Sequence, residues 1–169
     1  NIGDSFAKQV AETSVENYVL ELSSFQLDGI INFKPHIAII TNITPDHLDR
    51  YNYKFENYIA SKFRIAMNQT KEDYLIYDAD DEVINNYLNT HKIQSTLLPF
   101  SLTKKLEQGA YYKDKNIIIT IDNIKIIMPT TKLTIEGNHN VKNAMAASTV
   151  AHLLKIRKHT IRESLENFQ

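Results

Sequence analysis

The stretch IAIITNITPDHLDRY, residues 37–51, indicates how this chain is organised. Its first four residues are a short apolar run, which is typical of a buried strand. Polar residues follow directly: Thr41-Asn42, then a proline, then two aspartates that flank His47 and Leu48. In open parallel sheets, ligands bind beyond the carboxyl ends of the strands. The stretch therefore fits two interpretations, a strand followed by a helix cap or a strand that delivers polar groups to an active site.

Other short apolar runs resemble this one. They lie at residues 18–23, at 74–77 and, as a weaker candidate, at 96–100. Helical stretches are expected at 55–67 and 81–90. Strands that alternate with helices are typical of the α/β class, so the sequence predicts a mostly parallel sheet flanked by helices.

The second half of the chain changes character. Residues 116–121 and 124–128 are rich in isoleucine and enclose Asp122-Asn123, which predicts an antiparallel β hairpin with a two-residue turn. Tyr111-Tyr112 could add a third antiparallel strand. Residues 140–155 read as a helix with apolar residues on nearly every side, which is typical of a buried helix.

The composition narrows the functional classes. The chain has 169 residues, 43% of them hydrophobic and 23% charged, and a formal net charge of -1. This balance gives no electrostatic reason to expect nucleic acid or an anionic membrane as a partner. No cysteine is present, which excludes disulfides and thiolate chemistry. No apolar run approaches the roughly 18 residues of a spanning helix, so we expect a cytoplasmic protein.

The chain also lacks a familiar nucleotide motif. It has four glycines, none of which precedes a lysine, so the phosphate-binding loop G-x-x-x-x-G-K-[ST] does not occur in these residues. The first residue is Asn1 rather than methionine. We therefore expect the chain to be part of a longer protein.

Glu21 stands out within the first apolar run. An ionised carboxylate in a buried strand is costly unless it is paired, hydrogen-bonded or bound to a cation. Near a strand end it could hold Mg²⁺ beside a nucleotide phosphate, or it could face water on an edge strand. Ser23 and Gln26 follow, and their side chains could bind a polar ligand or cap the next helix, which is the commoner use.

Helix capping explains part of the polar stretch that follows the apolar run at residues 37–40. Thr44 suits a helix N-cap, Pro45 the first helical position, and Asp46 the positive end of a helix. Capping does not require His47 or Asp49. An imidazole at a strand end can bind a metal, bind phosphate or move a proton, although a lone histidine is more often structural.

Lys62 is placed by helical spacing on an apolar face, four residues after Tyr58 and four before Ala66. Its stem could simply cover apolar surface, or its amine could point into a site. Asn140 and Asn143 lie three residues apart and could present amides on one helix face. Capping by an asparagine is the commoner use there.

Acidic residues at 78–82 resemble a metal cluster. Asp80 as an N-cap, with Asp81 and Glu82 in the first helical turn, explains them without a cation.

In their order along the chain and their residue sequences, these motifs resemble those of the Mur ligase family. The matching strings are residues 1–3 (NIG), 21–27 (ELSSFQL), 42–51 (NITPDHLDRY), 61–65 (SKFRI), 78–81 (DADD) and 137–144 (GNHNVKNA). The strings ELSSFQL and DHLDRY look most like those of the members that add D-glutamate to UDP-N-acetylmuramoyl-L-alanine. Other Mur ligases and the folylpolyglutamate synthetases vary at these positions.

The resemblance implies a domain organisation and a reaction. Family members have three domains, and residues 1–169 look like part of the central ATP-binding domain. The phosphate-binding loop and a UDP-binding domain are then expected before Asn1, and a C-terminal domain after Gln169. In this family ATP phosphorylates the substrate carboxylate, and the amine of D-glutamate attacks the acyl phosphate. Mg²⁺, with two sites expected, neutralises the charge that accumulates.

The resemblance also implies roles for residues near the metals. Glu21 matches a glutamate that binds Mg²⁺ next to the ATP phosphates. His47 matches a histidine at the second magnesium and the muramoyl substrate. Lys62 matches a lysine that is carbamylated by CO₂, which converts a cation into an anionic oxygen ligand. On this basis Lys62 and His47 are the candidate catalytic residues.

Further matches concern the substrates. Asn1, Ser23 and Gln26 match residues that contact the muramoyl substrate. Asn140 matches an asparagine near both substrate and nucleotide, and Asn143 matches one near the nucleotide.

Two alternatives stay open. The chain could come from another Mur ligase or from a folylpolyglutamate synthetase. It could also be a non-catalytic nucleotide-binding module. In either enzyme reading, the isolated chain is expected to be inactive, because the phosphate-binding loop is not part of it.

Overall fold

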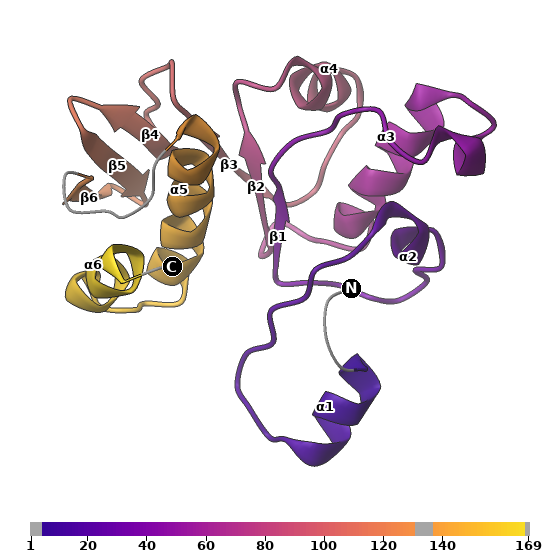
Figure 1. The fold of residues 1–169 in the computed structure, drawn as a ribbon, viewed down its shortest axis with the longest axis horizontal. Coiled ribbons are helices and arrows are strands. Elements are labelled where there is room, and N and C mark those ends of the chain that lie inside the picture. Colours follow the sequence, from indigo (N-terminus) through magenta and orange to yellow (C-terminus); the bar gives the residue numbers. More distant parts are fainter. Residues whose placement is uncertain (1–4, 131–136, 168–169) are drawn as a thin grey trace.

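The computed structural model describes residues 5–130 and 137–167 of the chain. Its centre is one six-stranded sheet in the order β1-β2-β3-β4-β5-β6, with helices on both faces (Figure 1). The strands are β1 (Ile37–Ile40), β2 (Tyr74–Asp78), β3 (Thr96–Ser101), β4 (Gly109–Lys113), β5 (Asn116–Ile121) and β6 (Ile124–Pro129). The helices are α1 (Phe6–Glu12), α2 (Ser24–Asp28), α3 (Phe55–Phe63), α4 (Glu82–Thr90), α5 (Asn138–Leu153) and α6 (Lys158–Glu166), with short 3₁₀ helices η1 (Leu48–Tyr51) and η2 (Arg64–Ala66).

The strand directions confirm the predicted class. Strands β1 to β4 pair in parallel, and β4, β5 and β6 pair antiparallel. The hairpin turns where expected, since Ile121 pairs with Ile124 across Asp122 and Asn123. These two residues have φ of 50° and 64°, and positive φ at both central positions is what a type I′ hairpin turn requires. Tyr111 and its neighbours form β4, as the sequence suggested.

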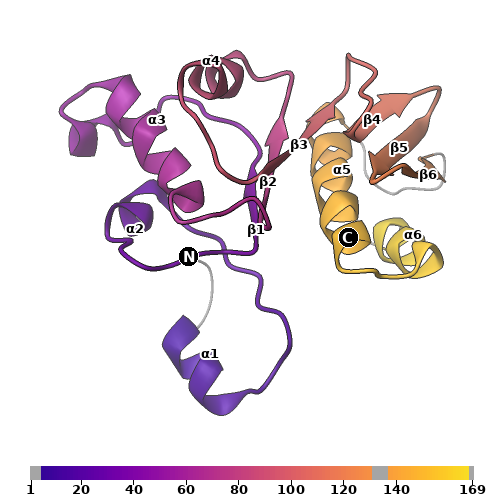
Figure 2. The ribbon, with the colours of Figure 1, turned by 180° about the vertical axis from the view of Figure 1, so that it is seen from behind.

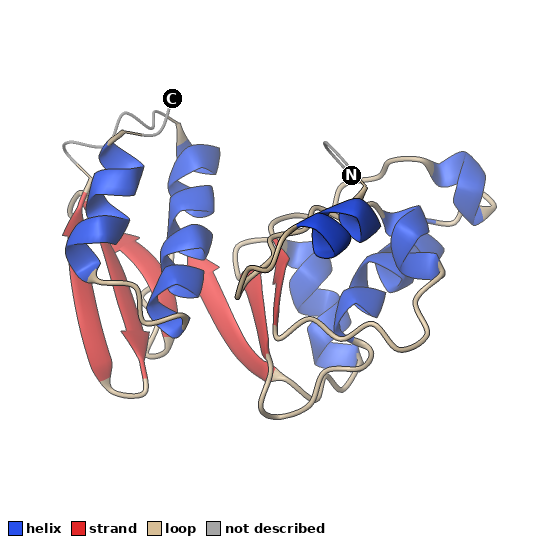
Figure 3. Cartoon of the chain, turned by 90° about the horizontal axis from the view of Figure 1, so that it is seen from below, coloured by secondary structure: helices blue, strands red, loops and turns tan. Residues whose placement is uncertain are grey.

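Two apolar cores cover opposite faces of the sheet. Adjacent residues of a strand point to opposite faces, and in β2 Leu75 belongs to one core while Ile76 belongs to the other. The first core also holds Phe63 and Ile84, from α3 and α4. The second holds residues of α5 and α6, which lie side by side on this face of the sheet (Figure 3), where α5 contacts β2 to β5. Helices therefore pack on both faces of the sheet, with α3 and α4 against β1 and β2 on one face and α5 and α6 on the other.

The expected strand at residues 18–23 is wrong. This segment is extended but carries no ladder hydrogen bonds, and its Val19 is 97% exposed. It runs alongside β1, an edge strand, and a cavity separates the two. An apolar run becomes a strand only where a neighbouring strand accepts its backbone hydrogen bonds, and in the described structure this segment has none.

The expected helices differ from the observed ones mainly at their ends. The stretch 55–67 is α3 followed by η2. Helix α5 begins at Asn138, and Gly137 is its N-cap without a side-chain bond, so capping by Asn138 or Asn140 is not observed. Helix α5 is buried on one face only, since Ala147 is exposed. Alanine-rich sequence does not distinguish a half-buried helix from a fully buried one.

Helix α1 stands apart from the sheet in both views of the ribbon (Figures 1 and 2). None of its residues is buried, and Phe6 contacts Tyr18 edge to face. Within residues 5–130 and 137–167, no helix is both long and apolar enough to cross a membrane.

Candidate functional site

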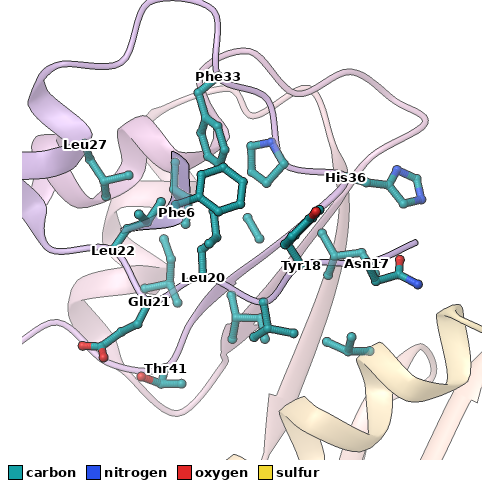
Figure 4. A pocket seen from close by; sticks show the side chains of 18 of the residues that line it. Phe6, Asn17, Tyr18, Leu20, Glu21, Leu22, Leu27, Phe33, His36 and Thr41 are labelled. Carbon is teal, nitrogen blue, oxygen red and sulfur yellow. The ribbon is translucent and has the colours of Figure 1, made fainter. Parts of the chain in front are cut away.

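A cavity of about 660 Å³ lies between β1 and the extended segment before α2. Residues 16–22 form one wall, and residues 35–42, which include β1, form the other. Aromatic side chains occupy one end, where Phe6, Phe33 and Tyr18 gather (Figure 4). The cavity thus combines an apolar body with a polar end, as small-molecule sites commonly do.

The polar end carries oxygen-bearing side chains. Glu21 and Thr41 both line it, and Figure 4 shows the Glu21 carboxylate pointing away from the aromatic side chains. Asn42 also lines the cavity. Carboxylate, hydroxyl and amide oxygens are ligands that suit Mg²⁺, so these residues fit such an ion. Elsewhere in the described ranges, as here, no three histidine or acidic side chains are grouped closely enough to hold a metal among themselves.

Lys62 lines the same cavity from α3. Its Nζ lies 5.5 Å from the centre of the Tyr58 ring, a cation–π arrangement. Burial, and then the nearby charges of Asp46 and Tyr51, raise the pKa of the Tyr58 hydroxyl. The predicted helical spacing is confirmed, because Lys62 lies over Tyr58 one turn away. The structure therefore brings Lys62 and Glu21 to one cavity.

His47 lies on the loop after β1, outside the lining of this cavity. Its backbone is left-handed, with φ of 49°, and it is the N-cap of η1. The Asp46 side chain accepts a hydrogen bond from the His47 backbone N–H at 2.8 Å. The centres of the His47 and Phe25 rings are 6.2 Å apart in an edge-to-face arrangement, and the Arg50 guanidinium lies over the Phe25 ring, 4.8 Å from its centre.

The expected cap at Thr44 is wrong. Residues 41–47 are not helical, and the first turn that forms is η1 at Leu48. The chain instead uses Ile43 to attach this loop, since the Ile43 N–H donates to Asp81 Oδ2 at 3.1 Å. Asp46 therefore accepts a hydrogen bond from the His47 backbone, and it does not lie in the first turn of a helix as the sequence suggested.

Ser23 and Gln26 form hydrogen bonds with each other at the start of α2. Ser23 is the N-cap of α2. Its N–H and hydroxyl both donate to Gln26 Oε1, at 2.9 and 2.8 Å. The capping explanation from the sequence is confirmed for this pair, while a substrate role remains a prediction.

Asn140 and Asn143 lie near the start of α5. Between them, Lys142 forms an ion pair with Asp78 at the carboxyl end of β2, with Nζ 2.6 Å from Oδ2. Neither asparagine lines the cavity with Glu21, although Val150 and Leu154 farther along this helical segment do. The predicted nucleotide residues are thus placed at a different part of the sheet edge. Asn1 lies outside the described residues.

The acidic stretch at 78–82 is structural, as expected, but the N-cap is a different aspartate from the one predicted. Asp81, not Asp80, is the N-cap of α4, and it accepts from the Ile84 N–H at 3.0 Å. Asp80 instead accepts from Ser101 Oγ at 2.6 Å and from Thr103 Oγ1 at 2.7 Å. Burial works to raise the pKa of Asp80, but these hydrogen bonds and the charge of Lys142 outweigh it and lower that pKa.

Sequence reasoning assigned no role to two groups of residues. Thr41 and Asn42 line the cavity directly after β1, and their position after a strand was the available signal. Phe25, whose ring meets that of His47, and Arg50, which lies over the Phe25 ring, gave no signal because they are 25 residues apart and on different elements.

Comparison with known proteins shows one family. Residues 4–151 match the family described as Mur ligase middle domain. A UDP-N-acetylmuramoylalanine--D-glutamate ligase of Christiangramia forsetii is 65% identical over 169 residues, which is all of this chain and 38% of that protein. A ligase with the same name from Bacteroides fragilis is 47% identical over the same coverage. The chain therefore spans about two fifths of the length of these relatives.

Solved structures share the fold at lower identity. MurF from Acinetobacter baumannii has a TM-score of 0.58 at 22% identity, covering 80% of this chain and 30% of that one. The UDP-N-acetylmuramate:L-alanyl-gamma-D-glutamyl-meso-diaminopimelate ligase from Neisseria meningitides has a TM-score of 0.60 at 16% identity, covering 80% and 40%. Because 148 consecutive residues match the middle domain of Mur ligases, the chain belongs to the Mur ligase family.

Proposed function

We propose that this chain is part of the central ATP-binding domain of an enzyme that joins D-glutamate to UDP-N-acetylmuramoyl-L-alanine, in peptidoglycan precursor synthesis. The observation that carries the proposal is the 65% identity, over every residue of the chain, with a ligase of that name. The phosphate-binding loop, the UDP-binding domain and the C-terminal domain would belong to other parts of the protein. Its nucleotide substrates would place the reaction in the cytoplasm.

The proposed reaction has two chemical steps. A carboxylate oxygen of the muramoyl substrate attacks the γ-phosphorus of ATP, and ADP leaves. The D-glutamate nitrogen then attacks the acyl carbon, phosphate leaves, and the nitrogen loses a proton as the amide forms. Bound Mg²⁺, at two proposed sites, would neutralise the oxygens that crowd together in the first step.

Glu21 and Lys62 are the residues with the strongest structural support. Both line one cavity, and Glu21 stands at its oxygen-rich end beside Thr41 (Figure 4). We propose that Glu21 holds Mg²⁺ and that Lys62 serves as a carbamate. An ammonium group cannot ligate a cation, whereas a carbamate oxygen can.

The remaining roles rest on the motifs. We propose that His47 acts at the second metal and the muramoyl substrate, from the loop after β1. Ser23 and Gln26 would contact the substrate at the start of α2, together with Asn1. Asn140 would contact substrate and nucleotide, and Asn143 the nucleotide, from the first turns of α5.

The substrate assignment can be tested directly in the full-length protein. ATP-dependent phosphate release is measured with UDP-N-acetylmuramoyl-L-alanine and, in turn, D-glutamate, L-lysine, diaminopimelate or a folate acceptor. Only D-glutamate should support turnover. Turnover with another amine instead would assign the chain to a different Mur ligase, and turnover with folates to a folylpolyglutamate synthetase. ATP binding without turnover would favour a non-catalytic module.

The metal role of Glu21 is tested by Glu21→Gln. We expect amide formation to fall by about 100-fold or more, because an oxygen ligand with full charge is lost, while the melting temperature stays within a few degrees. Glu16→Gln is the matched control, since Glu16 lines the same cavity from the same segment. Equal activity of the two variants would remove Glu21 from the metal site.

The carbamate role of Lys62 is tested by chemical rescue. We expect Lys62→Ala to be inactive and to regain part of its activity when formate or acetate is added, because a small carboxylate can replace the carbamate oxygens. Lys54→Ala, at the exposed N-cap of the same helix, should be active without the additive. Absence of rescue at every concentration would leave Lys62 as a lysine that only packs on Tyr58.

A further inference from the structure

Three side chains from three elements form one hydrogen-bonded cluster beside the proposed site. The Tyr51 hydroxyl donates to Asp28 Oδ2 at 3.0 Å, and the Ser61 hydroxyl lies 2.7 Å from Asp28 Oδ1. The two hydroxyl oxygens are 3.1 Å apart. Ser61 Oγ is also 2.9 Å from the backbone oxygen of Ser24. We refer to Asp28, Tyr51 and Ser61 as the Asp28 cluster.

The Asp28 carboxylate is the centre of the cluster, because both hydroxyls lie against it. Tyr51 is 7% exposed and Ser61 is 4% exposed, so each hydroxyl needs a partner inside the protein. Asp28 is exposed overall, and each of its two carboxylate oxygens lies within hydrogen-bond distance of one of these hydroxyls. A hydroxyl left without a partner in the interior would cost free energy. The carboxylate therefore fixes the side chains of Tyr51 and Ser61 together.

The three elements that meet here carry the proposed site residues. Asp28 ends α2, whose first turn holds Ser23 and Gln26. Tyr51 ends η1, for which His47 is the N-cap. Ser61 precedes Lys62 on α3.

A second contact ties two of these elements together farther along. Arg64 follows α3, and its Nε and Nη2 donate to the backbone oxygens of Leu27 and Ile30 at 2.9 and 2.8 Å. The end of α2 is therefore held against the end of α3 from two sides, and Tyr51 adds the loop that carries His47. No member of the Asp28 cluster lines the cavity with Glu21 and Lys62.

We propose that Asp28, Tyr51 and Ser61 are positioning residues, which set the relative placement of His47, Lys62 and the start of α2. This inference rests on the proposed function, because the residues that it positions are the proposed site. Catalytic geometry tolerates displacements of only about 0.5 Å, and supporting residues of this kind typically account for about 10- to 100-fold in activity.

The test uses Tyr51→Phe, Ser61→Ala and Asp28→Asn in the full-length protein. Asparagine has one acceptor oxygen where aspartate has two, so one of the two hydroxyls loses its contact with a carboxylate oxygen. We expect kcat for amide formation to fall about 10- to 100-fold, with a higher Mg²⁺ concentration needed for half-maximal rate. KM for ATP should change less than about threefold, since the proposed nucleotide residues lie on α5. Asp28→Glu should recover part of the loss.

Thr149→Val is the matched control for stability. Thr149 is a buried residue of α5 whose hydroxyl donates to the Met145 backbone oxygen at 2.8 Å. Its loss should lower the melting temperature about as much as Ser61→Ala while kcat and the Mg²⁺ requirement stay unchanged. If the cluster variants also lower only the melting temperature, the positioning role is overturned and the cluster is structural.

A readout without turnover separates this inference from the proposed function. Amide hydrogen exchange at residues 47–51 and 61–63 should rise in Tyr51→Phe and Ser61→Ala, and not in Thr149→Val. Unchanged exchange overturns the inference even where the enzyme is active. Wild-type protein that fails to use D-glutamate overturns the proposed function, whereas the exchange experiment still decides whether the cluster holds these segments.

Discussion

Lys142 Nζ lies 2.6 Å from Asp78 Oδ2, which joins the first turns of α5 to the carboxyl end of β2. The Asp78 side chain is 4% exposed and that of Lys142 is 26% exposed, so the pair is largely withdrawn from water. Asp80 Oδ2 lies 3.8 Å from the same Nζ. The Lys142 ammonium group therefore lies close to two carboxylates. In the sequence, Lys142 stands between Asn140 and Asn143.

We predict that Lys142→Met destabilises the protein by about 2–4 kcal/mol, because it leaves the buried Asp78 carboxylate without its counter-charge. Asp78→Asn combined with Lys142→Met should recover much of this loss, since the unpaired charge is gone. Urea unfolding of the two single variants and the double variant measures the coupling. Lys105→Met, an exposed lysine after β3, is the control. Additive single effects would mean that the pair is not coupled in solution.

Asp73 gives the protein a defined sensitivity to acid. Burial alone would raise the pKa of its carboxyl, but hydrogen bonds from Thr70, His36 and Lys34 outweigh burial and hold that pKa well below its usual range. Lys34 Nζ and His36 Nδ1 each lie 3.1 Å from the carboxylate. A lowered pKa contributes stability that is present above the unfolded-state value of about 3.9 and is lost as the pH falls through the folded-state value.

We therefore predict that the free energy of unfolding falls on acidification below about pH 4, and that Asp73→Asn removes part of this slope. The variant should also be less stable at pH 7, by about 1–3 kcal/mol, because its amide cannot accept all of the donors. Chemical unfolding between pH 2.5 and 7 measures both effects. Glu72→Gln, next to it and exposed, should keep the wild-type slope. An unchanged slope in Asp73→Asn would place the acid sensitivity elsewhere.

Local sequence signals predicted most of the sheet. The hairpin was predictable because Asp122-Asn123 favours the left-handed conformations that its turn uses, and β1 to β3 because helices separate their apolar runs. The prediction of a strand at residues 18–23 was wrong for a physical reason. Their composition suits a strand, but Val19 is almost fully exposed and no neighbouring strand accepts their hydrogen bonds.

The site was less predictable than the fold. Helical spacing placed Lys62 over Tyr58, and a charged residue in an apolar run drew attention to Glu21. The Asp28 cluster could not be foreseen, because Asp28 is 33 residues from Ser61 and 23 from Tyr51. Contacts between distant polar residues depend on how α2, η1 and α3 pack, and no spacing in the sequence encodes them.

The two tight turns of the antiparallel strands should respond differently to glycine. Lys115, between β4 and β5, has φ of 58°, and Asn123, between β5 and β6, has φ of 64°. Lysine is disfavoured in this left-handed conformation by about 1–2 kcal/mol, whereas asparagine tolerates it. We predict that Lys115→Gly stabilises the protein by about 0.5–1 kcal/mol and that Asn123→Gly changes little. Thermal unfolding measures both, and equal effects would contradict the left-handed strain at Lys115.

Gly109 begins β4 at a point where the chain cannot accept a side chain. Its φ is +99°, and a Cβ built there would lie 2.0 Å from the Pro99 carbonyl oxygen of β3. Backbone atoms cannot rotate away as a flexible side chain can, so the start of β4 would have to move from β3. We predict that Gly109→Ala destabilises the protein by about 3 kcal/mol or more.

Gly29→Ala is the matched control for this prediction. Gly29 follows α2 with φ of -82°, and a Cβ there meets only the Gln26 backbone oxygen at 3.8 Å. Alanine should be neutral there or stabilise by up to about 1 kcal/mol, because it restricts the unfolded chain. Urea unfolding compares the two variants, and insolubility of Gly109→Ala alone counts as the same result. Equal stability of both would show that β4 does not approach Pro99 this closely in solution, and that the junction of the parallel and antiparallel halves of the sheet differs from the one described.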